Sequence, residues 1–92
     1  MNAAMSFLPA CETPLNQHSL RSLEAWLTEL GAERTADDPC LWLWHQPSWS
    51  ADVRLDQDDL QVTWHQAGRA CQRTFPYGLP RADVEAAMRA GP

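Results

Sequence analysis

Apolar residues recur at two different spacings along the chain, and the spacing changes near residue 39. Between Ser19 and Gly31 they fall three or four positions apart, as on one face of an amphipathic helix. Ser19 is a suitable N-cap, and Gly31 suits the left-handed position that ends many helices. The pattern therefore predicts a helix over residues 19–31, with an apolar stripe made of Leu20, Leu23, Trp26, Leu27 and Leu30.

Three stretches after residue 39 have the spacing of two that is typical of strands. Residues 49–55 and 60–66 alternate between apolar and polar, so each predicts a strand with one buried and one polar face. Residues 40–46 predict a further strand before them. Pro47-Ser48 and the run from Asp56 to Asp59 supply the turns. We expect a three-stranded antiparallel sheet whose inward residues are Trp49, Ala51, Val53, Leu55, Leu60, Val62 and Trp64.

Residues 69–78 show no clear period. They fit either a short fourth strand or an extended connector, and we favour a connector that packs Phe75 and Tyr77. Pro80 suits the first turn of a second helix, which Gly91-Pro92 ends. Residues 32–39 are polar and predict a turn. The expected fold is α+β, in the order helix, three-stranded antiparallel sheet and C-terminal helix. Residues 18–92 form one domain, and residues 1–17 form a flexible or surface-laid N-terminal arm.

The faces of the first predicted strand are not settled by the pattern. Residues 41–44 read Leu-Trp-Leu-Trp, so one face carries Trp42 and Trp44 and the other carries Leu41 and Leu43. If the leucines join the core, the tryptophans are exposed among polar residues, as in the hot spots of protein interfaces. If the tryptophans join the core, the leucines lie outside. Both arrangements remain open.

Composition narrows the class of protein. The 92 residues suffice for one domain with one core. Twelve acidic residues against seven arginines give a net charge of -5, which argues against a phosphate-binding surface. Three widely spaced cysteines indicate a reducing compartment rather than a disulfide framework. No apolar run is long enough to span a bilayer, and the N-terminus lacks the features of a secretory signal, so we expect a cytoplasmic protein without membrane insertion.

Candidate chemistry is sparse. Cys40, His45, His65 and Cys71 could meet across neighbouring strands and serve a metal-dependent or thiol function, although their spacing does not match that of zinc knuckles. The acidic run at residues 56–59 lacks the central glycine and closing glutamate of a calcium loop. Phosphate-binding loops and the common hydrolase motifs are absent from the sequence. We therefore expect no catalytic residue, no metal and no cofactor, with the thiol or metal function as an alternative.

Two groups of residues resemble a family of small uncharacterised cyanobacterial proteins. The first comprises Thr13-Pro14-Leu15, His18, Leu20, Leu23-Glu24, Trp26-Leu27 and Leu30-Gly31. The second comprises Pro47-Ser48-Trp49, Ala51 to Leu55, Leu60, Val62, Ala67-Gly68, Gln72 to Phe75, Tyr77, Leu79, Arg81, Asp83 to Glu85 and Ala90-Gly91-Pro92.

The resemblance covers most of residues 13–92. The chain departs from it at Pro80, where a capping serine is expected, and near Arg69, where a longer loop is expected. It implies a cytoplasmic protein of an oxygenic phototroph and brings no established activity. It draws attention to Arg73-Thr74-Phe75, Tyr77 and the segment from Arg81 to Glu85 at the start of the second helix. This segment is either a docking surface or a packing signature, and both readings stay open.

The function expected from the sequence is that of a non-enzymatic protein-interaction or assembly-factor module. Such a module presents a sheet face or an exposed edge to a protein partner, a second copy of the chain included. The interaction candidates are Trp42, Trp44, Arg73, Phe75, Tyr77 and Arg81. The order helix, three strands, helix is also that of double-stranded-RNA-binding domains, but Arg81 is the only basic residue offered at the start of the second helix. Nucleic-acid binding is therefore an alternative that the charge disfavours.

Overall fold

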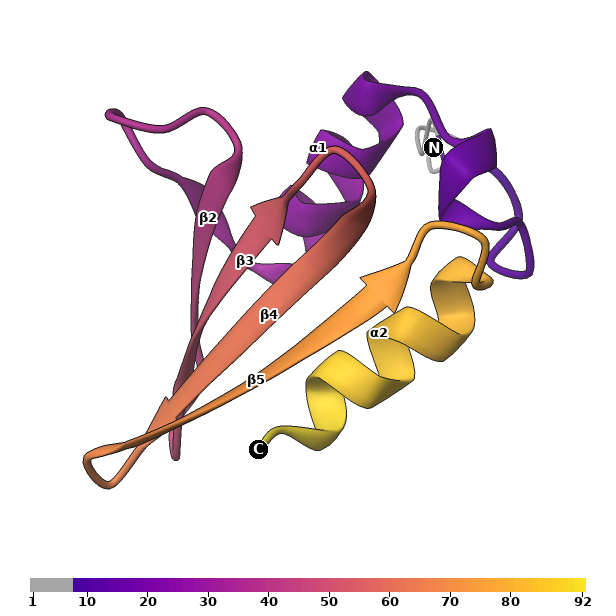
Figure 1. Ribbon diagram of the computed structural model, residues 1–92. Helices are drawn as coiled ribbons and strands as arrows, with labels where there is room; N and C mark the ends of the chain where they lie inside the picture. Colours follow the sequence, from indigo (N-terminus) through magenta and orange to yellow (C-terminus); the bar gives the residue numbers. More distant parts are fainter. Residues whose placement is uncertain (1–7) are drawn as a thin grey trace, which may run out of the picture.

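The computed structural model describes residues 8–92, which form a five-stranded antiparallel sheet with an α-helix before it and another after it (Figure 1). Each strand lies beside the next one in sequence, so the sheet is a simple meander. Residues 1–7 of the predicted arm lie outside the described residues. The elements are a 3₁₀ turn η2 (Leu15–Gln17), α1 (Leu20–Leu30), β1 (Glu33–Arg34), β2 (Leu41–His45), β3 (Ser50–Leu55), β4 (Asp59–Gln66), β5 (Arg69–Pro76) and α2 (Arg81–Ala90).

The first helix has the predicted ends. The Ser19 hydroxyl accepts a hydrogen bond from the backbone N–H of Ser22 at 3.0 Å, which satisfies one of the free donors of the first turn. Gly31 adopts the left-handed conformation with φ 100°, and its N–H bonds back to the last turn of α1. The chain then turns directly into the sheet.

The α+β class is confirmed, but the expectation of three strands was wrong. Residues 69–76, for which we favoured an extended connector, form an eight-residue strand that pairs with β4 along its whole length. The cause is the two-residue turn Ala67-Gly68, whose φ angles of 52° and 79° define a tight hairpin. A second strand was also missed, because Glu33–Arg34 is too short to show a period and pairs with Leu43 and Trp42.

The sheet has one buried and one open face. We call the buried side the inner face, because the apolar residues of both helices pack against it in a single core. Its residues are Trp42, Trp44, Ala51, Val53, Leu55, Leu60, Val62, Trp64, Gln66, Arg69, Cys71, Arg73 and Phe75. The opposite side, the outer face, carries Leu41, Leu43, His45, Ser50, Asp52, Arg54, Gln61, Thr63, His65, Ala70, Gln72 and Thr74. The structure is therefore a two-layer arrangement of helices on a sheet.

The two orientations left open for residues 41–44 are resolved in favour of buried tryptophans. Trp42 and Trp44 are only 4% and 1% exposed, whereas Leu41 and Leu43 are partly exposed on the outer face. Because large aromatic side chains bury much apolar surface, they let a small chain fill its core. Trp42 and Trp44 are thus core residues and do not present an exposed aromatic patch.

Indole N–H groups fix the helices on the inner face. Trp44 donates to the Leu30 carbonyl at the end of α1 (3.0 Å), and Trp64 donates to the Met88 carbonyl near the end of α2 (3.3 Å). Trp26 of α1 donates to the Glu85 carboxylate of α2 at 2.8 Å and joins the two helices. Each bond satisfies a polar group that packing would otherwise leave without a partner.

Residues 13–16, which lead into η2 and begin it, pack against the connection between β5 and α2. Backbone N–H groups of Leu15 and Asn16 donate to the carbonyls of Leu79 and Tyr77 at 3.1 and 2.8 Å. The N–H of Arg81 donates in turn to the Thr13 carbonyl at 3.0 Å. Leu15 is 1% exposed, so the part of the predicted arm that the structure describes contributes a residue to the core.

Two tryptophan substitutions test the role of the indole bonds. Trp44→Phe removes a donor and leaves the Leu30 carbonyl unpaired, whereas Trp42→Phe removes an indole N–H that has no partner in the described chain. We expect Trp44→Phe to lower the free energy of unfolding by about 1–2 kcal/mol more than Trp42→Phe does. Urea denaturation of both variants measures the difference. Equal losses would show that only indole volume matters.

Candidate docking edge

β5 is the open edge of the sheet. Seven of its eight residues are exposed, and only Phe75 is buried. The opposite edge is formed by β1, which has two residues and is therefore blunted as an edge strand. In Figure 1, β5 runs from the hairpin after β4 up to the connection with α2, with no further strand beside it. Of the two edges of the sheet in the described chain, β5 is thus the one with a long strand unpaired on one side.

The register shows which backbone groups of β5 are free. The residues that flank a two-residue hairpin turn exchange hydrogen bonds with each other, and bonded pairs then alternate along the ladder. Gln66 and Arg69 flank this turn, so residues 69, 71, 73 and 75 bond to β4. The backbone N–H and C=O groups of Ala70, Gln72 and Thr74 therefore point away from the sheet.

The open part of this edge has definite ends. At one end is the Ala67-Gly68 turn. At the other end, Pro76 has no N–H, and its carbonyl accepts a bond from the N–H of Leu79. Beyond Pro76 the backbone is covered by residues 13–16, as described above. The free edge consequently spans residues 70–74.

An open groove lies beside the free edge on the inner face. It encloses about 560 Å³ and is lined by Trp64, Gln66, Ala67, Arg69, Ala70, Cys71 and Pro92. The groove exists because the end of α2 lies over tryptophan side chains and not over β5. Gly91, just after α2, lies so close to Trp49 that a Cβ atom at position 91 would be only 2.7 Å from Trp49 Nε1. The first half of β5 is therefore left uncovered by the helix.

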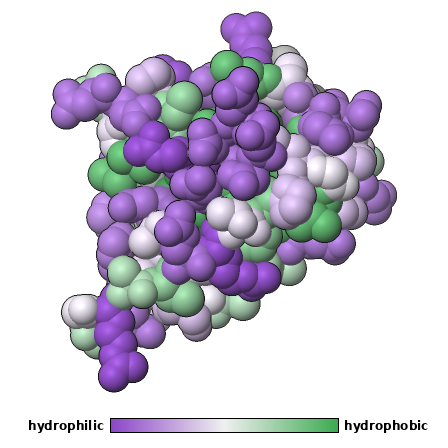
Figure 2. Space-filling view, viewed as in Figure 1, coloured by the Kyte–Doolittle hydropathy of each residue, from purple (hydrophilic) through white to green (hydrophobic). Residues whose placement is uncertain are grey.

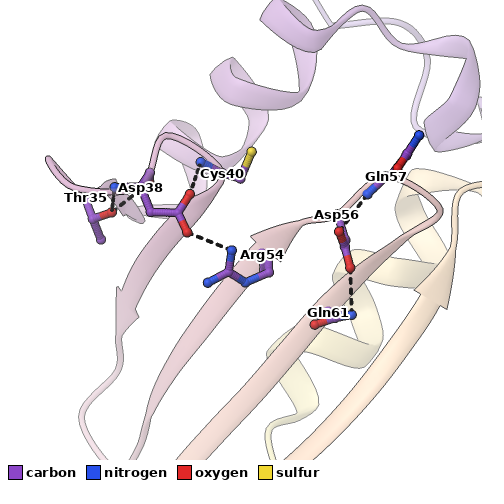
Figure 3. Close-up of polar contacts among 7 residues, drawn as sticks. All are labelled: Thr35, Asp38, Cys40, Arg54, Asp56, Gln57 and Gln61. Carbon is purple, nitrogen blue, oxygen red and sulfur yellow. Dashed lines mark hydrogen bonds and ion pairs between the residues drawn. The ribbon is translucent and has the colours of Figure 1, made fainter.

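The outer face of the sheet has no apolar surface comparable to the groove beside β5. Its residues are mostly polar, and hydrophobic residues are scattered among hydrophilic ones on the side of the molecule seen in Figure 2. An ion pair joins this face to the loop before β2, because Arg54 contacts Asp38 at 2.7 Å (Figure 3). A hydrogen bond from the Cys40 N–H, together with the Arg54 guanidinium, holds the pKa of Asp38 below its usual value. Arg54 is thus engaged within the chain.

The six interaction candidates from the sequence lie in different environments. Trp42, Trp44 and Phe75 are buried. Arg81 is also buried, and its guanidinium donates to the Pro9 carbonyl at 3.1 Å and to His18 Nε2 at 3.4 Å. Tyr77 is partly buried, with its hydroxyl donating to the Asp56 carbonyl. Of the six, Arg73 alone is exposed, and its guanidinium lies 5.0 Å from the centre of the Phe75 ring.

The metal and thiol candidates are not gathered into one donor set. His45 and His65 lie on the outer face, whereas Cys71 lies on the inner face and Cys40 precedes the opposite end of β2. His65 Nε2 lies 3.2 Å from Asp52 Oδ2 in an exposed pair. Within residues 8–92, no group of three or more His, Cys, Asp or Glu side chains is placed to hold a metal ion.

Of the residues on β5 beside the groove, the sequence analysis named Arg73 as an interaction candidate and Cys71 only as a thiol or metal candidate, and it missed the others. Arg69, Ala70, Cys71, Gln72 and Thr74 do not alternate between apolar and polar, because neither of their faces is covered. The Ala67-Gly68 pair, which follows a clearly alternating strand, was the available signal for a hairpin.

Neither α1 nor α2 of the described chain is long and apolar enough to cross a membrane.

Tyr77 reports on the end of β5, and it is the chain's single tyrosine. Burial, followed by the negative charges of Asp59 and Asp56, raises its pKa to about 12. Since the folded state holds the phenol proton more tightly than the unfolded state, this contribution to stability is complete below pH ~10 and is lost as pH rises through about 12.

An ultraviolet absorbance titration of the phenolate tests this environment. We expect a midpoint at about 12 in the folded protein and near ~10 in denaturant. Asp59→Asn removes one of the negative charges and should lower the folded midpoint. A folded midpoint equal to that in denaturant would contradict the described packing.

Comparison with known proteins identifies a family. No curated protein and no solved structure matches this chain. The family model described as "Protein of unknown function (DUF3143)" matches residues 30–91, which include all five strands and α2. The match covers the candidate edge together with the elements that position it. The chain therefore belongs to the DUF3143 family of proteins of unknown function.

Proposed function

We propose that this protein is a non-enzymatic protein-interaction module that binds an extended segment of a partner along β5. The observation that carries the proposal is the free edge at residues 70–74, a row of unpaired backbone donors and acceptors on an otherwise complete sheet. Edge strands of this kind are templates for strand addition, in which main-chain bonds supply affinity and side-chain contacts supply specificity.

The cellular setting forms part of the proposal. The resemblance of residues 13–92 to cyanobacterial proteins supports an assembly-factor role in an oxygenic phototroph. Cys11, Cys40 and Cys71 are free and exposed, which suits the reducing cytoplasm. The nucleic-acid alternative gains no support, because Arg81 is buried and cannot reach a phosphate group. The thiol or metal alternative gains none either, because its cysteines and histidines do not form a metal-binding group within residues 8–92.

A proline at the centre of the edge tests strand addition. The Gln72 N–H points away from β4, so Gln72→Pro removes an outward donor without breaking the hairpin ladder. Tagged wild-type protein, Gln72→Pro and Gln72→Ala are used to capture partners from extracts of the native host. We expect a partner that the wild type and the alanine variant retain, and that the proline variant binds at least about tenfold more weakly.

Thermal unfolding of the proline variant serves as the control for folding. A partner captured equally by a folded Gln72→Pro protein would show that the edge is not the binding surface.

A further inference from the structure

The charges near the free edge differ from those of the rest of the protein. Residues 60–82 contain three arginines and no aspartate or glutamate, whereas the remaining residues carry twelve acids and four arginines. The chain as a whole has a net charge of -5, so β5 belongs to a cationic stretch of an acidic protein. An acidic partner segment would therefore be attracted to β5 and repelled by the acidic remainder of the protein.

Most arginines outside β5 are engaged within the chain. Arg34, Arg54 and Arg89 contact the carboxylates of Glu24, Asp38 and Glu85 within 3.2 Å. Arg81 is buried against the Pro9 carbonyl and His18. Arg69 and Arg73 are exposed and have no carboxylate partner among residues 8–92, and residues 1–7 contain no acid that could supply one. Neither guanidinium group therefore has an ionic partner in the described chain, although that of Arg73 lies over the Phe75 ring.

Geometry places both arginines where an added strand would meet them. Side chains at positions 69, 71 and 73 share the inner face, and the groove beside them includes Arg69 and Cys71. A side chain directly opposite Cys71 on an added strand has Arg69 and Arg73 as its two diagonal neighbours, within reach of long side chains. A carboxylate at that position would lie between two unpaired cations.

A second copy of the chain fits this edge poorly. In a symmetric antiparallel pairing centred on Gln72, Arg73 lies opposite Cys71 of the other copy and Arg69 lies opposite Phe75. Four arginines would then share one face of the joined sheet with no acidic side chain among them. Like charges on neighbouring strands are destabilising, so the edge favours a partner of opposite charge over itself.

We infer that the segment added to β5 is an extended acidic peptide, with glutamate or aspartate at alternate positions facing the α2 side of the sheet. This inference rests on the proposed docking at β5 and specifies the chemistry of the partner. Main-chain bonds to Ala70, Gln72 and Thr74 hold the segment, and Arg69 and Arg73 select its charge. Two arginines in an acidic protein are too few for the phosphate contacts on which nucleic-acid affinity depends.

Fluorescence anisotropy with three labelled eight-residue peptides tests the inference. The peptides alternate threonine with glutamate, glutamine or lysine. We expect the glutamate peptide to bind the full chain at least about tenfold more tightly than the glutamine peptide at low salt, and the lysine peptide to bind least. The advantage should shrink as salt is added, because the charges are exposed.

Matched variants locate the effect. Arg69→Gln with Arg73→Gln should abolish the preference for glutamate. Arg21→Gln with Arg34→Gln changes the net charge equally, near α1 and the opposite edge strand β1, and should preserve the preference. Gln72→Pro should abolish binding of all three peptides.

The remaining outcomes separate this inference from the proposed function. Equal binding of the three peptides, lost in Gln72→Pro, would overturn the acidic preference and leave edge docking standing. A dimer in sedimentation that Gln72→Pro dissociates would identify a second copy as the occupant and overturn the inference in the same way. Absence of binding by any peptide, glutamate binding that Gln72→Pro does not affect, or displacement of the glutamate peptide by single-stranded RNA would also overturn it.

Discussion

The positions of the two helices depend on the indole N–H groups of the inner face. Trp44 and Trp64 donate to carbonyls at the C-terminal ends of α1 and α2, and Trp26 joins the helices through Glu85. The Trp64 bond and the close approach of Gly91 to Trp49 place the end of α2 over the tryptophans, so the first half of β5 is not covered by the helix. The tryptophans of this small chain thus fill the core and also set where α2 ends, which leaves the first half of β5 uncovered.

The backbone of β5 and that of the segment after it differ in whether their polar groups have partners. Residues 13–16 pair with the backbone after β5 and satisfy its polar groups, whereas the backbone of Ala70, Gln72 and Thr74 has no partner in the described chain. Because the backbone that follows β5 is covered and residues 70–74 of β5 are open, a binding segment has a defined length and register. The unpaired arginines on that half add a preference for charge.

The sequence predicted those parts of the fold where burial imposes a period. Strands β3 and β4 alternate because one face of each lies under the helices, and Ser19 and Gly31 marked the ends of α1. In β5 the inner positions Arg69 and Cys71 are uncovered and need no apolar side chain, so its pattern was lost. The faces of β2 could not be assigned because leucine and tryptophan are both apolar, and the candidate edge depends on pairing that no local pattern encodes.

Residue-resolved amide hydrogen exchange of the free protein tests the open edge most directly. If β5 is an unpaired edge strand, the amides of Cys71, Arg73 and Phe75 are protected by β4, while those of Ala70, Gln72 and Thr74 exchange rapidly. An alternating pattern along this one strand is the predicted result. Protection of all six amides would show that the edge is already covered in the free protein and would contradict the account.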